Sequence, residues 1–317
     1  MKLFAVLLAA ALPLPAVAQD FPQRPVRLIV AVPPGNGADT VARSIAQRLT
    51  ERWARSVIVD NRTGAGGAIA MELTARATPD GHTLLFASMG LVATATLLKK
   101  VAFDTQHAFT PIGQMTVQPY LLAVNPALPF AGVRELIAYA RANPGALNYA
   151  SSGTGSGSHL GMERFKRMAG IDIVHVPYKG SSQAVADLAG GQIQVLFASA
   201  ITAMPFVRSG RFRVLAVASL HKSRLFPDLP TVAESGVPGF ELSTSYALYG
   251  PAALTSLLTD KINRDAGRAL ESPEVARQLA LDGAEAAPAN TPAAFKLLLA
   301  QEAANSEQVL RQSGISR

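Results

Sequence analysis

Glycine-rich segments precede three amphipathic stretches of this 317-residue chain. They read PPGNGAD (33–39), NRTGAGGA (61–68) and SSGTGSGSH (151–159). Glycine lets the backbone approach a bound group closely because no Cβ stands in the way. At the first turn of a helix, unpaired N–H groups and the positive end of the helix dipole attract an anion. One such loop is more often a simple turn, but three in one chain favour the binding of an anion.

The spacing of these glycines does not fit a nucleotide site. A dinucleotide-binding fingerprint needs glycine at its sixth position, whereas counting from Gly35 gives Thr40 and counting from Gly153 gives Ser158. The GxxxxGK[ST] pattern of a phosphate-binding loop does not occur in the sequence.

The sequence also lacks a recognisable catalytic constellation. No G-x-S-x-G elbow or H-E-x-x-H pair occurs. The chain has no cysteine, which excludes disulfides, zinc–thiolate sites and thiol nucleophiles. We therefore expect no catalytic residue, no metal and no cofactor. A secreted enzyme acting on small carboxylic acids or esters remains the alternative.

The first residues, MKLFAVLLAAALPLPAVAQD, have the composition of a secretory signal. An apolar stretch follows Lys2 and ends at the small-residue site Ala16-Val17-Ala18. This stretch is short for a membrane anchor, and two prolines interrupt it. We expect export, with residues 1–18 removed by cleavage after Ala18.

Composition and charge favour a globular protein without a nucleic-acid partner. Hydrophobic residues make up 49% of the chain and charged residues 16%. The 29 basic and 22 acidic residues give a net charge of +7, but the basic residues are scattered. No stripe of Lys and Arg interleaved with aromatic residues is present. A mildly positive field suits anionic small molecules, and solubility explains it equally well.

Two sets of alternating elements must position the loops. Apolar runs rich in Val, Ile and Leu alternate with amphipathic stretches, as in parallel sheets with crossover helices. We expect strands within 26–32, 56–61, 79–88, 146–152, 171–178, 193–199 and 212–219. We expect one helix that is capped by Asp39 and one helix after each of the second and third glycine-rich loops. We expect further helices over 133–141, 254–271, 273–282 and 291–312.

Two α/β sets of similar size predict two lobes with a hinge and a cleft. Extended segments at 119–126 and 241–249 lie where the chain would cross between the lobes. A micromolar ligand requires about −8 kcal/mol, whereas one helix end contributes only about 0.3–1 kcal/mol when exposed. Several loops from both lobes are therefore needed, and we expect the cleft to close on its ligand.

Taken in order, these segments resemble the tripartite tricarboxylate transporter substrate-binding proteins, the Bug family. The similar stretches span most of the chain after the signal and lie at 21–49, 57–88, 147–197 and 225–243. The most specific pair is VPYKGS (176–181) followed by DLPTVAESGVPGF (228–240).

The resemblance implies an α/β periplasmic-binding-protein, or Venus flytrap, fold of two lobes. Each lobe would be a mainly parallel sheet flanked by helices, and two crossover segments would form the hinge. The expected boundaries are 19–121 with 249–317 for lobe 1, and 122–248 for lobe 2. The family implies a periplasmic receptor that captures a small carboxylate, such as a di- or tricarboxylate, an acidic amino acid or an aromatic acid. Its partners would be integral-membrane permease subunits, with the receptor itself a monomer.

The resemblance also implies a site. In the family, loops matching GNGAD and SSGTGSGSH hold one ligand carboxylate from opposite lobes through backbone N–H groups, hydroxyls and bridging water. The expected ligand-binding residues are Asn36, Gly37, Ala38, Ser88, Ser152, Gly155, Ser156 and Ser199. The roles of His159, Lys179 and Asp39 stay open.

Departures from the family pattern bear on ligand choice. The family usually has a hydroxyl residue at Gly157, an aspartate at Ala198 and a tryptophan near Tyr246. Losing a hydroxyl and an acid makes the distal part of the site less polar, which favours an aromatic or less charged acid.

Overall fold

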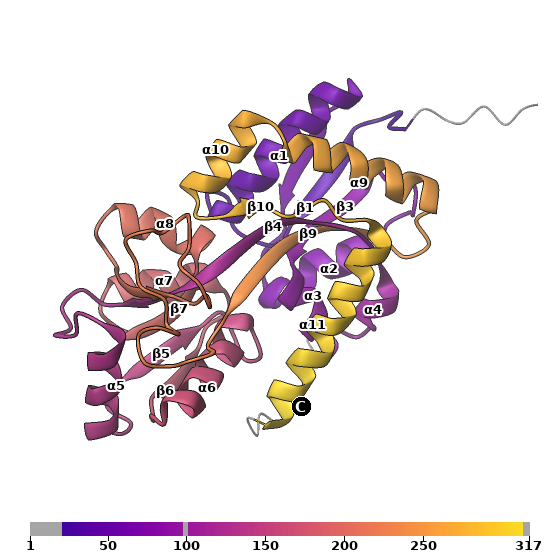
Figure 1. Cartoon of the computed structure of the whole chain (residues 1–317). Helices are drawn as coiled ribbons and strands as arrows, with labels where there is room; N and C mark the ends of the chain where they lie inside the picture. The colour runs from indigo at the N-terminus through magenta and orange to yellow at the C-terminus, as the bar shows by residue number, and fades with distance from the viewer. Residues whose placement is uncertain (1–20, 98–100, 313–317) are drawn as a thin grey trace, which may run out of the picture.

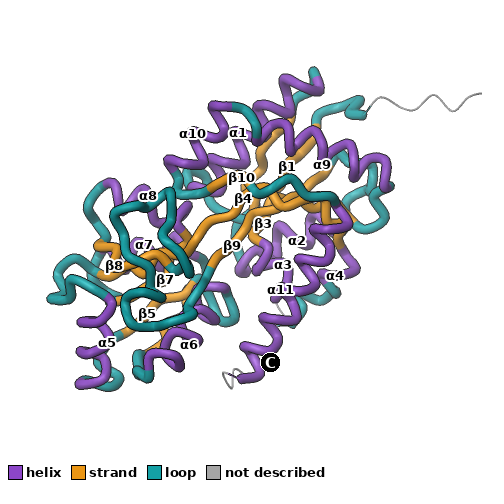
Figure 2. The backbone as a smooth tube through the Cα atoms, viewed as in Figure 1, coloured by secondary structure: helices purple, strands orange, loops and turns teal. Residues whose placement is uncertain are grey.

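The computed structural model describes residues 21–97 and 101–312, which form two α/β lobes connected by long strands (Figures 1 and 2). The expected signal, residues 1–18, and its cleavage site lie outside the described residues. Within those residues, no helix combines the length and apolar character that a membrane span requires.

The first lobe is built on a sheet whose outer part is parallel. Its strands are β1 (Val26–Val30), β2 (Val57–Asn61), β3 (Thr83–Ser88), β9 (Ser243–Pro251), β10 (Glu285–Ala286) and the first part of β4 (Phe109–Val124). β1 lies between β2 and β3 in parallel. β9 is antiparallel to β3 and to β4, and β10 is antiparallel to β4. The parallel part carries the glycine-rich loops at the carboxyl ends of its strands, where α/β proteins bind ligands.

Helices cover both faces of this sheet because its strands are apolar on both sides. Val26, Leu28 and Val30 face one apolar cluster, whereas Ile29 faces another. The first face is covered by α1 (Gly37–Trp53), α9 (Ser256–Leu270) and α10 (Pro273–Leu281). The opposite face is covered by α2 (Ala68–Ala75), α3 (Met89–Ala95) and α11 (Pro292–Gln312), with η1 (Ala65–Gly67) and α4 (Thr105–Ala108) nearby.

The second lobe repeats this arrangement on a smaller scale. β5 (Asn148–Ser151) pairs in parallel with β6 (Val174–Pro177) and β7 (Val195–Ser199). The last part of β4 pairs antiparallel with β7 and with β8 (Arg213–Val217). One face packs on α5 (Val133–Ala142) and α6 (Gly157–Ala169), and the other on α7 (Ser181–Ala189) and α8 (Ala200–Arg208).

β4 and β9 form the connection between the lobes. β4 pairs with β9 from Phe109 to Pro119, and from Tyr120 onward it pairs with β7 in the second lobe. The return connection passes through Leu242, whose carbonyl accepts from the Tyr120 amide and whose amide donates to the Ala218 carbonyl. The two expected crossover segments thus lie side by side. The two-lobed fold is confirmed, and the boundaries at 121/122 and 248/249 stay a prediction.

The start of α1 differs from the expectation that Asp39 caps it. The helix begins at Gly37, and Asn36 is the N-cap, its Oδ1 accepting from the Ala38 amide at 3.0 Å. Asp39 is buried and turns back toward the loop, where its carboxylate accepts from the Gly35 amide at 2.9 Å. The expected cap was wrong because partners outside the helix hold Asp39.

Candidate functional site

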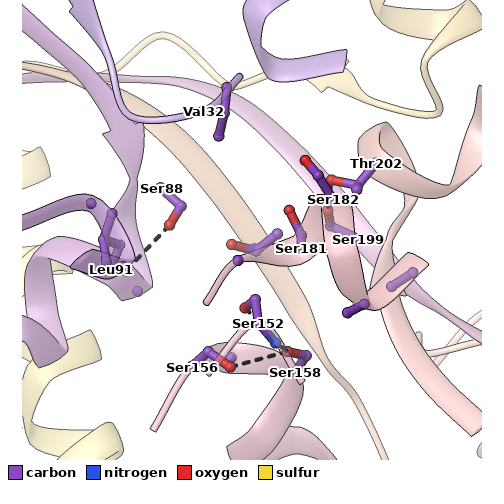
Figure 3. Close-up of a pocket in the computed structure, with 18 of the residues that line it drawn as sticks. Val32, Ser88, Leu91, Ser152, Ser156, Ser158, Ser181, Ser182, Ser199 and Thr202 are labelled. Atoms are coloured by element: carbon purple, nitrogen blue, oxygen red, sulfur yellow. Dashed lines mark hydrogen bonds between the residues drawn. The ribbon is translucent and has the colours of Figure 1, made fainter. Parts of the chain in front are cut away.

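A cavity of about 330 Å³ lies where the lobes face each other. This volume suits a small molecule. Hydroxyl groups from both lobes line it (Figure 3), and they belong to Thr63, Ser88, Thr94, Ser152, Ser156, Ser158, Ser181, Ser182, Ser199, Thr202, Ser243 and Thr244. Groups of this kind both donate and accept hydrogen bonds, so they can bind either a donor or an acceptor on a polar ligand.

The structure brings four of the eight expected residues together around this cavity. Ser88 comes from the first lobe, and Ser152, Ser156 and Ser199 come from the second. The other four, Asn36, Gly37, Ala38 and Gly155, do not belong to its lining.

Three serines of the 151–159 loop form a connected cluster at the start of α6. Ser158 Oγ accepts from the Ser152 amide at 3.0 Å and lies 3.0 Å from Ser156 Oγ. Ser156 is also the N-cap of α6, accepting from the His159 amide at 3.4 Å. The cluster therefore sets hydroxyl groups at the positive end of a helix of thirteen residues. This is the part of the cavity best suited to an anion.

His159, whose role the sequence left open, supports this loop from beneath. It is buried, and its Nδ1 accepts from the Gly155 amide at 2.8 Å. Its ring stacks on His175 with centroids 3.9 Å apart, and His175 Nε2 lies 2.7 Å from Ser151 Oγ. Burial lowers the pKa of His175, which favours the neutral form of that ring. His159 does not line the cavity and holds the loop in place instead.

The start of α7 also lines the cavity, and the sequence analysis gave it no site residue. Lys179, Gly180, Ser181 and Ser182 all contribute to the wall. Lys179 is exposed at the preceding turn. Gly180 has a φ of +154°, and this turn resembles the 151–159 loop: glycine is followed by serine at the start of a helix. That pattern in YKGSS was the signal that could have identified it.

The first lobe contributes Ser88 and the second glycine-rich loop. Ser88 is the N-cap of α3 and accepts from the Leu91 amide at 3.3 Å. Gly67 has a φ of +93°, and a Cβ on it would stand 2.5 Å from a methyl group of Leu91. Glycine is therefore required here to let the loop lie against α3 and border the cavity.

The first glycine-rich loop uses its polar groups internally. Burial alone would raise the pKa of Asp39, but bonds from Arg43, Asn61 and the Gly35 amide outweigh burial and lower it. Gly37 packs against α8 of the other lobe, where a Cβ would overlap the carbonyl oxygen of Ile201. The loop thus forms a contact between the lobes beside the cavity.

Aromatic side chains complete the walls. Tyr120 lies on β4 at the crossover, and Tyr246 on β9 stacks on Phe86 with centroids 5.4 Å apart. Burial raises the pKa of Tyr246 to about 12 and raises that of Tyr120 as well. Both phenols therefore remain neutral donors at physiological pH.

Only two charged side chains line the cavity among the described residues, Lys179 and Glu302. Glu302 comes from α11, and burial raises the pKa of its carboxyl group. The sequence of 291–312 predicts a helix but gives no local signal that this acid belongs to a site. No group of three or more His, Asp or Glu residues suited to a metal ion occurs within 21–97 and 101–312.

Two α/β lobes on a hinge of paired strands, with a polar cavity between them, define a bilobal solute-binding protein. The chain belongs to the tripartite tricarboxylate transporter family receptors, whose family model matches residues 41–315. These are periplasmic binding proteins, not enzymes, so the enzyme alternative is set aside.

Curated and solved relatives agree with this assignment. Protein BugT of Bordetella pertussis is 34% identical over 302 residues, covering 95% of this chain and 92% of BugT. Rpa4515 of R. palustris, solved with adipate, is 34% identical with a TM-score of 0.87, covering 94% of this chain and 99% of that one. MatC from Rhodopseudomonas palustris, solved with bound malate, is 30% identical with a TM-score of 0.83, covering 92% of this chain and 100% of that one.

Proposed function

We propose that this receptor captures a small carboxylic acid in the cavity between its lobes and delivers it to permease subunits of a tripartite transporter. The observation that carries the proposal is the hydroxyl-rich lining contributed by both lobes, with the serine cluster at the start of α6. The solved relatives with adipate and malate support an acid as the ligand.

The serine cluster gives the ligand carboxylate its main contacts in this proposal. Hydrogen bonds to a charged group contribute roughly 1.5–3 kcal/mol each. Ser152 and Ser156 would donate from the second lobe and Ser88 from the first, with Ser199 beside them. Association costs several kcal/mol, so a micromolar ligand needs contacts from both lobes.

The remaining expectations belong to the same proposal. Ligand contacts are also predicted for Asn36, Gly37, Ala38 and Gly155. These four residues lie outside the cavity lining. The lobes are proposed as 19–121 with 249–317 and 122–248. We further propose cleavage after Ala18, a monomeric mature receptor and partnership with integral-membrane permease subunits.

Calorimetric titration with malate, adipate, acidic amino acids and aromatic acids tests the function. At 100 times its dissociation constant, a ligand adds about 2.7 kcal/mol to stability and raises the melting temperature. At least one acid should bind to one site per chain and be recovered unchanged. Absence of binding by every acid, or conversion of the acid to product, would contradict the proposal.

Ser156→Ala tests the site, with Thr255→Ala as its matched control. Both residues are helix N-caps, but Thr255 caps α9 away from the cavity. Each variant should lose about 1 kcal/mol of stability. Only Ser156→Ala should lower the affinity for the ligand, by about 10- to 150-fold. Equal affinities in the two variants would remove Ser156 from the site.

A further inference from the structure

Glu302 places a carboxylate in the cavity wall without a partner. It lies on α11, which packs against α3, and its Oε1 is 3.7 Å from where a Cβ on Gly90 would stand. Among the residues that the structure describes, its carboxylate makes no hydrogen bond and no ion pair. Its electrostatic neighbours are the hydroxyl groups of Tyr120 and Tyr249.

This arrangement is unfavourable for the charged form of Glu302. Glu302 is half-buried, and a carboxylate without a partner loses part of its hydration when it is half-buried. Burial accordingly raises the pKa of Glu302. The Tyr249 hydroxyl, which does not line the cavity, is also buried without a hydrogen-bond partner among the described residues. Lys179, the other charged residue of the wall, belongs to the second lobe and is exposed.

The two lobes therefore offer opposite chemistry to one ligand. The second lobe presents hydroxyl groups and the start of α6, which favour an anion. The first lobe presents Glu302, which favours a cationic nitrogen and repels a second carboxylate.

We propose that Glu302 pairs with an ammonium group of the ligand, so that the cavity selects carboxylic acids carrying an amino group over the same acids without one. This inference rests on the proposed function and specifies its ligand: an amino acid whose carboxylate meets the serine cluster. Glu302 is then the residue that discriminates among acids.

Two matched pairs of acids test the inference by calorimetric titration: 2-aminoadipate against adipate, and phenylalanine against 3-phenylpropanoate. In each pair that binds, the wild-type receptor should favour the amino acid by tenfold or more. Glu302→Gln should weaken binding of the amino acid and strengthen binding of the matched acid without nitrogen, so that the preference is lost or reversed. Tighter binding of the acid without nitrogen by the wild type, or an equal effect of Glu302→Gln on both members, would overturn the inference.

Two further variants separate charge from folding. Glu302→Asp keeps the negative charge and should retain the preference, even if both affinities fall. Glu307→Gln removes an acid of the same helix that pairs with Arg311 and does not line the cavity, and it should leave the preference unchanged. If only acids without nitrogen bind, the role of Glu302 is refuted while the proposed function stands. If no acid binds, both fail.

Discussion

The hydroxyl of Tyr120 occupies the space in which a side chain on Gly157 would have to stand. A Cβ on Gly157 would be 2.5 Å from that hydroxyl oxygen and 3.3 Å from the ring carbon that bears it. Gly157 is the first residue of α6, directly after the Ser156 cap, and both line the cavity with Tyr120. The missing side chain at 157 is thus compensated by a phenol from the crossover strand, which keeps this wall polar.

Gly157→Ala should therefore destabilise the protein by about 1–3 kcal/mol, because the Tyr120 ring is buried and has little room to move. In a Tyr120→Phe background the same change should cost less than half as much, since the clashing oxygen is gone. Urea unfolding of the four proteins of this double-mutant cycle measures the coupling. Additive effects would show that the two residues do not compete for space.

Gly37→Ala should push the lobes apart. Its Cβ would overlap the Ile201 carbonyl oxygen of α8, which is backbone and moves only with its lobe. We expect a loss of about 1–3 kcal/mol in stability and a larger radius of gyration in small-angle X-ray scattering.

Gly267→Ala is the control for that substitution. Gly267 lies inside α9, and among the described residues nothing outside its own stretch of helix lies within 4 Å of its Cβ position. Alanine there should stabilise the protein by about 0.5–1 kcal/mol. An unchanged radius in Gly37→Ala would mean that the lobes absorb the side chain locally.

His175 should make stability depend on pH near neutrality. Burial lowers its pKa below the ordinary value of 6.5, so the unfolded chain binds the proton more tightly than the folded one. The contribution of neutral His175 to the free energy of unfolding is complete above about pH 6.5. It declines as the pH falls toward the lower pKa that His175 has in the folded protein. Charged neighbours act in opposite directions: Glu163 raises the pKa and Lys166 lowers it.

His175→Gln should reduce the slope of stability against pH between about 6.5 and 5. Gln can still reach the Ser151 hydroxyl, which lies 2.7 Å from His175 Nε2. Urea midpoints across this range provide the measurement. An identical slope in the variant would assign the pH dependence to other groups.

Asp265 should stabilise the protein at neutral pH and lose this effect in acid. Its buried carboxylate accepts from Trp53 Nε1 at 2.8 Å and from Lys261 Nζ at 2.9 Å, and it also pairs with Arg52. Burial alone would raise its pKa, but these bonds lower it below the ordinary 3.8. The contribution is therefore full above 3.8 and disappears as the pH falls through the folded value.

Asp265→Asn should cost about 1–3 kcal/mol at neutral pH and flatten the acid limb of the stability curve. Asp260→Asn, at an exposed position of the same helix, should stay within about 0.5 kcal/mol of wild type. Denaturant unfolding at several pH values distinguishes them, and equal effects would contradict the role given to Asp265.

Much of the fold could be predicted because the strands carry a clear pattern. The alternation of Val26, Leu28 and Val30 with Ile29 is the period of a strand with two buried faces. Such patterns also predicted the other parallel strands and the crossover segments, whereas α3, α4 and β10 were not predicted. The serine cluster could also be anticipated, because glycine and serine before a helix are a local signal.

The rest of the site depends on contacts that sequence order does not reveal. Asn36 and Asp39 are both good N-caps, and partners on another strand decide between them, since Asn61 bonds the Asp39 carboxylate at 2.9 Å. Glu302 is one acid among several on an amphipathic helix. Only the packing of α11 against α3 turns it into the cavity, 144 residues after Ser158 of the serine cluster.

The pairing of β4 with β9 across the junction restricts how the receptor changes shape. Two connections held together by backbone hydrogen bonds bend as a single ribbon, so the halves swing about one axis and resist sliding or twisting. We therefore expect the lobes to close to a similar outline with different ligands. Under the proposed function, substitutions in the wall would change which ligand is bound without changing the outer surface of the lobes.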